Sequence, residues 1–257
     1  MSSLRPLCVG FSTPDSARAK RPSAARTIVC FSPTGDLAGG AVVVAIGVDA
    51  CRHLKGRPEN LAIATLPLLL GLHQVDETFV WWGLQGHVSK EVGHVATWIY
   101  LLFALVVLPL LVPALLAVFE HSPRRRWRYA PFGVLGGFVS GVLLEAMLVG
   151  HPTARLGAYH LVYSIGLQHG VVFIGLYIVA TCGPLLASGR EVLIWFGVAN
   201  LAAVIILALL CASGFTSLWC FYAALVSGAI ALHLRLRQPH ARAVVGAGLS
   251  PSATLPT

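Results

Sequence analysis

The chain has 257 residues, of which 56% are hydrophobic and only 11% are charged, and its formal net charge is +8. Soluble globular domains carry about 25% charged residues, so this composition excludes an ordinary cytosolic enzyme, a disordered chain and a secreted disulfide scaffold. The composition predicts an integral membrane protein. Because the cations cluster in short segments between apolar runs, we expect cytoplasmic loops and no nucleic-acid partner.

The first 28 residues are rich in Ser, Arg and Pro and contain no apolar stretch long enough for a signal peptide. We expect residues 1–28 to form a disordered extension. Val29 precedes Cys30-Phe31-Ser32, and valine codons can start translation in bacteria. We therefore expect the native protein to begin there, as Met-Cys-Phe-Ser.

Seven apolar stretches follow, each close to the roughly 20 residues that cross a bilayer as a helix. The sequence predicts an all-α fold, a polytopic membrane protein whose seven-helix transmembrane bundle occupies residues 29–235, with a disordered cytoplasmic tail at 236–257. The expected spans are 36–51, 61–84, 95–118, 131–150, 158–186, 192–212 and 216–234.

The distribution of Lys and Arg over the loops sets the expected orientation. The run Arg124-Arg125-Arg126-Trp127-Arg128 between the third and fourth spans is the strongest cytoplasmic signal. It predicts the N-terminus outside, the C-terminus inside and a multi-pass location in a bacterial inner membrane.

The second span carries an unusual group of polar residues. His73, Asp76 and Glu77 stand at positions i, i+3 and i+4, which share one helix face, and Trp81 extends that face. Ionisable groups inside a bilayer are costly, so each needs a partner or a function. With the predicted orientation, these groups lie between the middle and the outer side of the membrane.

The fourth and fifth spans add further polar groups to the outer half. Gly133, Gly137 and Gly141 recur every four residues and lead to Glu145, which predicts a seam of close helix packing. His151 follows that span. His160 and His169 of the fifth span would face opposite sides of a helix, so we expect one of them to join Glu145 and the second-span group in a polar pocket.

Three sets of residues resemble a known family. They are Cys30-Phe31-Ser32-Pro33, the turn Gly47-Val48-Asp49-Ala50, and Leu66-Pro67-Leu68-Leu69 continuing through His73-Gln74 to Trp81-Trp82-Gly83. Together they resemble a family of uncharacterised actinobacterial multi-pass membrane proteins whose members begin Met-Cys-Phe-Ser. The resemblance covers most of residues 29–235 and implies a bacterial inner-membrane protein, without implying an activity.

The preferred functional hypothesis is a membrane enzyme that cyclises a lipid-soluble isoprenoid or terpenoid substrate. A carboxyl group among apolar side chains can keep its proton and act as a general acid, and aromatic faces stabilise carbocations. In this hypothesis Glu77 donates the proton, Asp76 or His73 sets its protonation, and Glu145 takes the final proton. The substrate would contact the aromatic residues Trp81, Trp82, Phe79 and Tyr163. Small seven-span membrane-bound terpene cyclases are similar in size and in this combination of acid and aromatic groups.

Two other function classes use the same residues. A divalent metal could bind imidazole and carboxylate ligands from His73, Glu77, Glu145 and His160, which would favour a metal-dependent hydrolase. A proton-coupled transporter could use the same groups as a relay. The preferred hypothesis needs no cofactor, its partners are the bilayer and a small lipophilic substrate, and the oligomeric state stays open.

Overall fold

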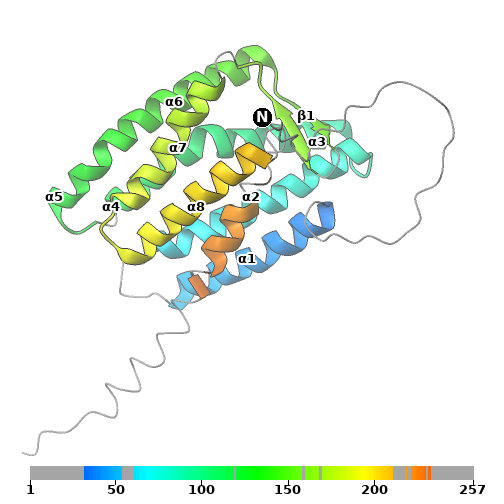
Figure 1. Ribbon diagram of the computed structural model, residues 1–257. Helices are drawn as coiled ribbons and strands as arrows, with labels where there is room; N and C mark the ends of the chain where they lie inside the picture. The colour runs from blue at the N-terminus through cyan, green and yellow to red at the C-terminus, as the bar shows by residue number, and fades with distance from the viewer. Residues whose placement is uncertain are drawn as a thin grey trace, which may run out of the picture.

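The structure is a computed structural model that describes residues 32–53, 61–118, 120–157, 160–167, 170–210, 218, 221–229 and 231–232. It is mostly helical, and its helices run side by side in a bundle (Figure 1). The first half contains α1 (Pro33–His53), α2 (Leu61–Gln85), and a long helix made of α3 (Lys90–Leu101), the π-helical segment η2 (Leu102–Val107) and α4 (Leu108–Val118).

The second half begins with the short helix α5 (Pro123–Arg126) and a 3₁₀ turn, η3 (Trp127–Tyr129), which lead into α6 (Ala130–Gly150). After a β-hairpin, α7 (Gly170–Leu186) and α8 (Glu191–Leu210) complete the labelled helices, and residues 221–229 are also helical. Observed helices overlap six of the seven predicted spans. Where both ends of a helix are described, those ends agree with the predicted ones to within five residues. The expected extension at 1–28 and the tail at 236–257 lie outside the described residues.

The prediction of a helix from residue 158 is wrong. Strands β1 (Thr153–Leu156) and β2 (Leu161–Ser164) pair antiparallel, with Ala154 opposite Tyr163. The Gly157 amide donates to the His160 carbonyl at 2.8 Å and closes the turn. Leu161, Val162 and Ile165 make this segment as apolar as a span, so hydropathy did not separate the hairpin from a helix. His160 therefore lies in the turn, and His169 lies outside the described residues.

Glycines allow the helices to approach closely, although not at the predicted seam. A Cβ at Gly136 of α6 would collide with the Pro109 carbonyl of α4. Gly133 and Gly141 have no neighbour within 4 Å among the described residues, and the nearest atom to a Cβ at Gly137 is a Leu110 side-chain carbon at 3.8 Å. The seam prediction is thus wrong, because the bundle-facing side of α6 is offset by one position from the repeated glycines.

Three helical segments are long and apolar enough to cross a membrane, namely Pro33–Arg52, Lys90–Val118 and Pro123–Gly150. No more than 39% of the most apolar window of each segment is buried, and large apolar side chains face outward; on α6, for example, Val134 is 76% exposed and Val149 is 75% exposed. An outer surface this apolar is costly in water and favourable in lipid.

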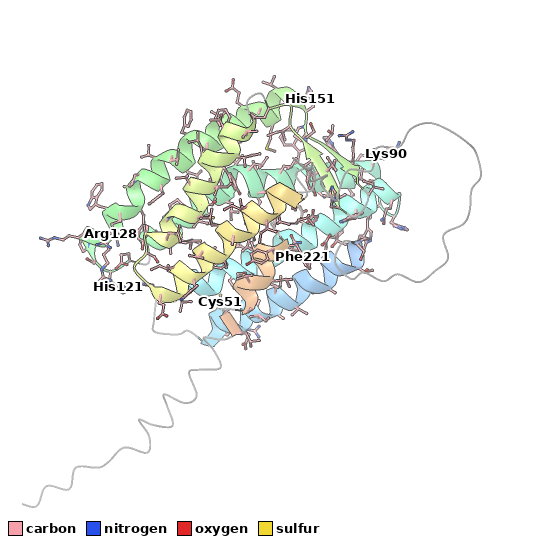
Figure 2. The ribbon with its side chains drawn as sticks, viewed as in Figure 1. Cys51, Lys90, His121, Arg128, His151 and Phe221 are labelled. Atoms are coloured by element: carbon pink, nitrogen blue, oxygen red, sulfur yellow. The ribbon has the colours of Figure 1, made fainter. Side chains whose placement is uncertain are left out.

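The described Lys and Arg residues lie at the two ends of the bundle. Figure 2 shows Arg128 and His121 at the α5 end, and Lys90 and His151 at the hairpin end. Of the described Lys and Arg residues, six belong to the α5 end (Arg52, Arg124, Arg125, Arg126, Arg128 and Arg190), and two, Lys90 and Arg155, belong to the hairpin end.

Candidate functional site

Buried polar side chains gather near the hairpin end, where α1, α2, α3 and β2 meet. On α2, His73 is 4% exposed, and Gln74 and Glu77 are fully buried. Four further residues lie beside them and are joined to the group or to each other by hydrogen bonds and ring stacking: Asp36, Trp81, Tyr100 and Tyr163. We call these seven residues the polar cluster. The second-span prediction thus located the α2 contribution to this cluster.

Glu77 is held by a residue of the hairpin. The Tyr163 hydroxyl donates a hydrogen bond to Oε1 of Glu77 at 3.2 Å. The Tyr163 ring stacks on the Tyr100 ring with centroids 4.7 Å apart, and the other neighbour of Tyr100 is the His73 ring at 4.0 Å, both at an interplanar angle of 15°. Three parallel rings from α2, α3 and β2 therefore fix the position of the Tyr163 hydroxyl on Glu77.

A second buried hydrogen bond joins α1 to α2. The indole Nε1 of Trp81 donates to Oδ2 of Asp36 at 2.8 Å, and both residues are almost fully buried. The indole N–H of Trp81 is thus bound to Asp36, and its expected contact with substrate stays a prediction. A short hydrogen bond to a carboxyl group that is shielded from water fixes how α1 and α2 are aligned along their axes.

Some polar atoms of α2 remain available to a ligand or to water. Nε2 of His73 and Oδ2 of Asp76 are buried and have no hydrogen-bond partner within the described part of the chain. An unsatisfied buried polar atom is costly, and such atoms in native proteins call for a specific explanation. Asp76 itself is half-buried.

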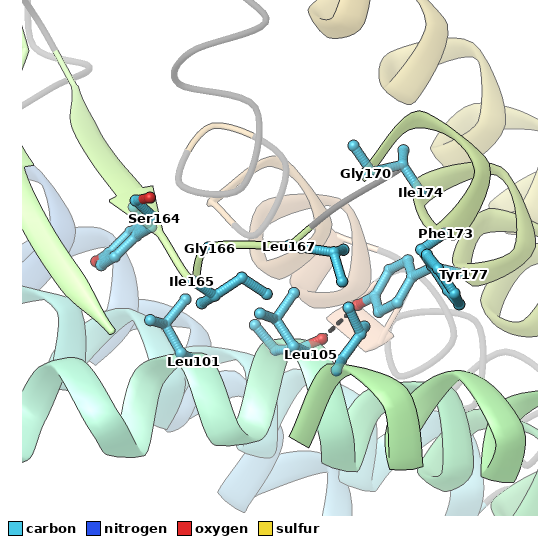
Figure 3. Close-up of a pocket in the computed structure, with 13 residues that line it drawn as sticks. Leu101, Leu105, Ser164, Ile165, Gly166, Leu167, Gly170, Phe173, Ile174 and Tyr177 are labelled. Atoms are coloured by element: carbon cyan, nitrogen blue, oxygen red, sulfur yellow. Dashed lines mark hydrogen bonds between the residues drawn. The ribbon is translucent and has the colours of Figure 1, made fainter. Parts of the chain in front are cut away.

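An apolar cavity of about 340 Å³ adjoins the polar cluster. It lies between η2, α6, α7 and the residues after β2, and Figure 3 shows Ile165, Phe173 and Tyr177 on its wall. Tyr163 also lines it. Tyr163 is thus the residue that belongs to both the polar cluster and the cavity.

The cavity wall includes the π-helical segment. The hydroxyl of Tyr177 donates to the Ala104 carbonyl at 2.5 Å, the bond drawn in Figure 3, and Ser140 donates to the Val106 carbonyl at 2.7 Å. π-Helical turns are rare and are found frequently at functional sites. Here, side chains of α6 and α7 satisfy the carbonyl groups that the wider turn presents.

Several predicted residues lie elsewhere. Phe79 and Trp82 pack edge to face with centroids 5.3 Å apart, and Phe79 is 36% exposed, so the structure does not bring them into the cluster. Glu145 lies on the exposed side of α6, because Leu143 and Met147 turn the opposite side of that helix toward the bundle.

The proposed metal ligands are not gathered into one site. Among the described residues, no three His, Cys, Asp or Glu side chains are grouped as a metal site would require. His73 and Glu77 share the polar cluster, whereas Glu145 is exposed on α6. His160 is buried in the hairpin turn beside Gly157.

Comparison with known proteins identifies one family. The model of a family of unknown function, DUF6629, matches residues 29–245. No curated protein matches the chain. No solved structure matches it either. The match covers the polar cluster, the cavity and every labelled helix. The chain therefore belongs to the DUF6629 family, whose function is unknown.

Proposed function

We propose that this chain is a seven-span protein of a bacterial inner membrane, with its N-terminus outside and its C-terminus in the cytoplasm. Three span-length helices, their outward apolar residues and the excess of arginine at the α5 end support this proposal. In this arrangement, the polar cluster and the hairpin lie in the outer half of the bilayer.

We further propose that the protein is an enzyme that cyclises an isoprenoid substrate held in the apolar cavity. The observation that carries this proposal is the position of Tyr163, whose hydroxyl binds the buried carboxyl of Glu77 while its side chain lines the cavity. A proton from Glu77 can reach a substrate in the cavity through this hydroxyl. Aliphatic walls exclude water, which would otherwise capture a carbocation.

The proposed reaction is a net isomerisation. The hydrogen bond between the two groups first reverses, so that the Glu77 carboxylic acid donates to the Tyr163 oxygen. The Tyr163 proton then moves to one carbon of a substrate double bond, whose π electrons form the new C–H bond, and the Glu77 proton replaces it on the phenol. The carbocation left on the other carbon accepts the π electrons of a second double bond and closes a ring. A proton then leaves the ring and returns through Tyr163 to the Glu77 carboxylate. No oxidant, reductant or cofactor is consumed.

The aromatic residues in this proposal differ from those expected from sequence. Tyr163, Phe173 and Tyr177 line the cavity and can present their π faces to a cation. They take the place of Trp82 and Phe79. The Glu77–Tyr163 pair serves as both donor and final acceptor, because Glu145 is exposed on the far side of α6.

The test makes the same change, Glu to Gln, at two positions. Each purified protein is supplied with polyprenyl hydrocarbons, alcohols and monophosphates in D2O. Wild type should form a cyclic isomer with one solvent deuterium, detected by mass spectrometry. Glu77→Gln should abolish turnover with little change in melting temperature, because the amide oxygen still accepts from Tyr163. Glu145→Gln, the same change on the exposed side of α6, should retain turnover. An active Glu77→Gln enzyme would overturn the proposal.

A second candidate function is proton-coupled transport. It is favoured by a cavity of about 230 Å³ beside Asp49, in the half of α1 farther from the hairpin. Asp49 would supply a polar step between the cluster and the cytoplasm. Proton uptake into liposomes that is driven by a substrate gradient and lost in Asp49→Asn would favour transport over catalysis.

A further inference from the structure

A second cavity lies at the hairpin end, beyond the apolar one. Its volume is about 450 Å³, and it is open to the surface between the end of α2, the start of α3 and the first residues after α6. Its lining includes Lys90, His94 and His151, and the described residues that line it include no Asp or Glu. Figure 2 shows Lys90 and His151 at the same end of the bundle. Three basic side chains around one cavity are suited to an anion.

His94 is prepared to donate a hydrogen bond. The indole Nε1 of Trp98 donates to Nε2 of His94 at 3.1 Å. Because Nε2 accepts this bond, the neutral imidazole carries its proton on Nδ1. His94 therefore offers the N–H of its remaining nitrogen as a donor, and the ammonium group of Lys90 offers further donors.

His151 is held in a conformation that favours glycine. Its φ of 50° is the only positive φ of a non-glycine residue in the described ranges. The chain is fixed on both sides: a Cβ at Gly150 would collide with the Ile165 carbonyl, and Pro152 is buried. Such outliers cost free energy and cluster at functional sites. His151 therefore lines the cavity although its backbone is held in a strained conformation.

The two cavities meet the same pair of residues in the hairpin. Ala154 lines the basic cavity and Tyr163 lines the apolar one, and these residues are direct cross-strand partners. Directly opposed residues in an antiparallel pair have Cα atoms about 4.5–5.5 Å apart. The two cavities therefore approach each other at this cross-strand pair, which is the route that one molecule with an anionic head and an apolar tail would take past Tyr163.

We propose that the basic cavity binds the phosphate head group of a long-chain isoprenoid whose tail occupies the apolar cavity. This inference rests on the proposed function and names its substrate class, a polyprenyl phosphate. In the proposed orientation the basic cavity lies at the level of lipid head groups, so the amphiphile can enter from the outer leaflet. Phosphate accepts several charge-assisted hydrogen bonds, which matches Lys90, His94 and His151.

Binding to the full chain in detergent micelles tests the inference, with farnesyl monophosphate, farnesol and inorganic phosphate as probes. Farnesyl monophosphate should bind roughly tenfold or more tightly than either of the other two, because only it uses both cavities. Equal affinity for inorganic phosphate and farnesyl monophosphate would show a site for the free anion and overturn the lipid inference. Equal affinity for farnesol would overturn the role of the head group.

Matched variants locate the binding site. Lys90→Gln should weaken farnesyl monophosphate binding, whereas Arg155→Gln, the same loss of charge at the same end but outside the cavity lining, should not. His151→Gly should weaken binding while it maintains or raises the melting temperature, because glycine relieves the positive φ. His87→Ala, which changes an exposed histidine outside the lining, should leave both unchanged. Full binding by both Lys90→Gln and His151→Gly would overturn the inference.

Binding and turnover report on the two proposals separately. Glu77→Gln should bind farnesyl monophosphate like wild type, since Glu77 does not line the basic cavity. If that variant binds but does not turn over, both proposals hold. If wild type cyclises uncharged isoprenoids but does not bind farnesyl monophosphate, the head-group inference fails and the proposed function stands. If wild type binds farnesyl monophosphate but cyclises no isoprenoid, the head-group inference holds as a binding site and the proposed function fails.

Discussion

The hydroxyl of Tyr163 lies 3.2 Å from Oε1 of Glu77, although 86 positions separate the two residues in the chain. The hairpin thereby places a phenol between a fully buried carboxyl and an apolar cavity. Because Glu77 is fully buried and Tyr163 is partly buried, this hydrogen bond is stronger than the same bond in water would be.

Removal of the Tyr163 hydroxyl should affect both stability and chemistry. Tyr163→Phe keeps the ring that stacks on Tyr100 but removes a donor from a buried carboxyl, which costs about 1–3 kcal/mol. We expect a lower melting temperature. We also expect a loss of turnover at least as large as the loss of folded protein would cause. Tyr222→Phe is the control, since its hydroxyl donates at 3.2 Å to the Ala199 carbonyl, away from the cluster. Turnover equal to wild type in Tyr163→Phe would remove the phenol from the proton path.

The bond between Trp81 and Asp36 should couple α1 to α2. A double-mutant cycle with Trp81→Phe and Asp36→Asn measures that coupling, and we expect about 1–3 kcal/mol. Unfolding in mixed micelles with increasing denaturing detergent gives the free energies. Trp127→Phe combined with Asp36→Asn is the control, because Trp127 is 77% exposed at the opposite end. A coupling near zero for Trp81 and Asp36 would mean that packing alone joins the two helices.

Adjacent glycines of α6 should respond in opposite ways to alanine. Gly136→Ala drives a methyl group into the Pro109 carbonyl and should separate α6 from α4, lowering stability by about 1–3 kcal/mol. Gly137→Ala meets only a Leu110 side-chain carbon at 3.8 Å, so its higher helix propensity should stabilise by about 0.5–1 kcal/mol. Melting temperatures of the two variants provide the comparison. Equal destabilisation by both would contradict the packing side assigned to α6.

The two ends of the bundle should lie on opposite sides of the membrane. Arg128→Cys and His151→Cys, made in a cysteine-free background, place one thiol at each end. A membrane-impermeant maleimide should label the cysteine at 151 in intact cells and the cysteine at 128 only after the membrane is opened. Labelling of both in intact cells would rule out the proposed seven-span orientation.

Helix positions and the polar face of α2 were predictable from the sequence because both depend on local periodicity. The expected span 61–84 coincides with α2, and His73 and Glu77 occupy one buried face as their spacing predicted. Tyr163 lines the apolar cavity together with twelve other residues, and its contact with a substrate stays a prediction.

The rest of the site depends on contacts between distant parts of the chain. Tyr100 gives no periodic signal, since its importance comes from stacking between His73 and Tyr163. The basic cavity exists because the hairpin returns over α3, and hydropathy cannot distinguish an apolar hairpin from the start of a helix. Glu145 was placed with the cluster on the assumption that Gly141 faces the bundle, whereas Gly136 marks the packed side.

The π-helical segment governs which side of a 29-residue helix faces inward. Buried residues recur every four positions along it, at Tyr100, Ala104, Leu108, Val112 and Leu116. In an uninterrupted α-helix, the first and last of these would point about 160° apart. The widened turn absorbs about 100° of that rotation, the angle that one inserted residue adds to an α-helix, and frees the Ala104 and Val106 carbonyls for Tyr177 and Ser140. The shape of the apolar cavity is therefore set by directional bonds, and single-residue deletions between Leu102 and Val107 should deform this cavity while leaving both flanking halves of the helix facing inward.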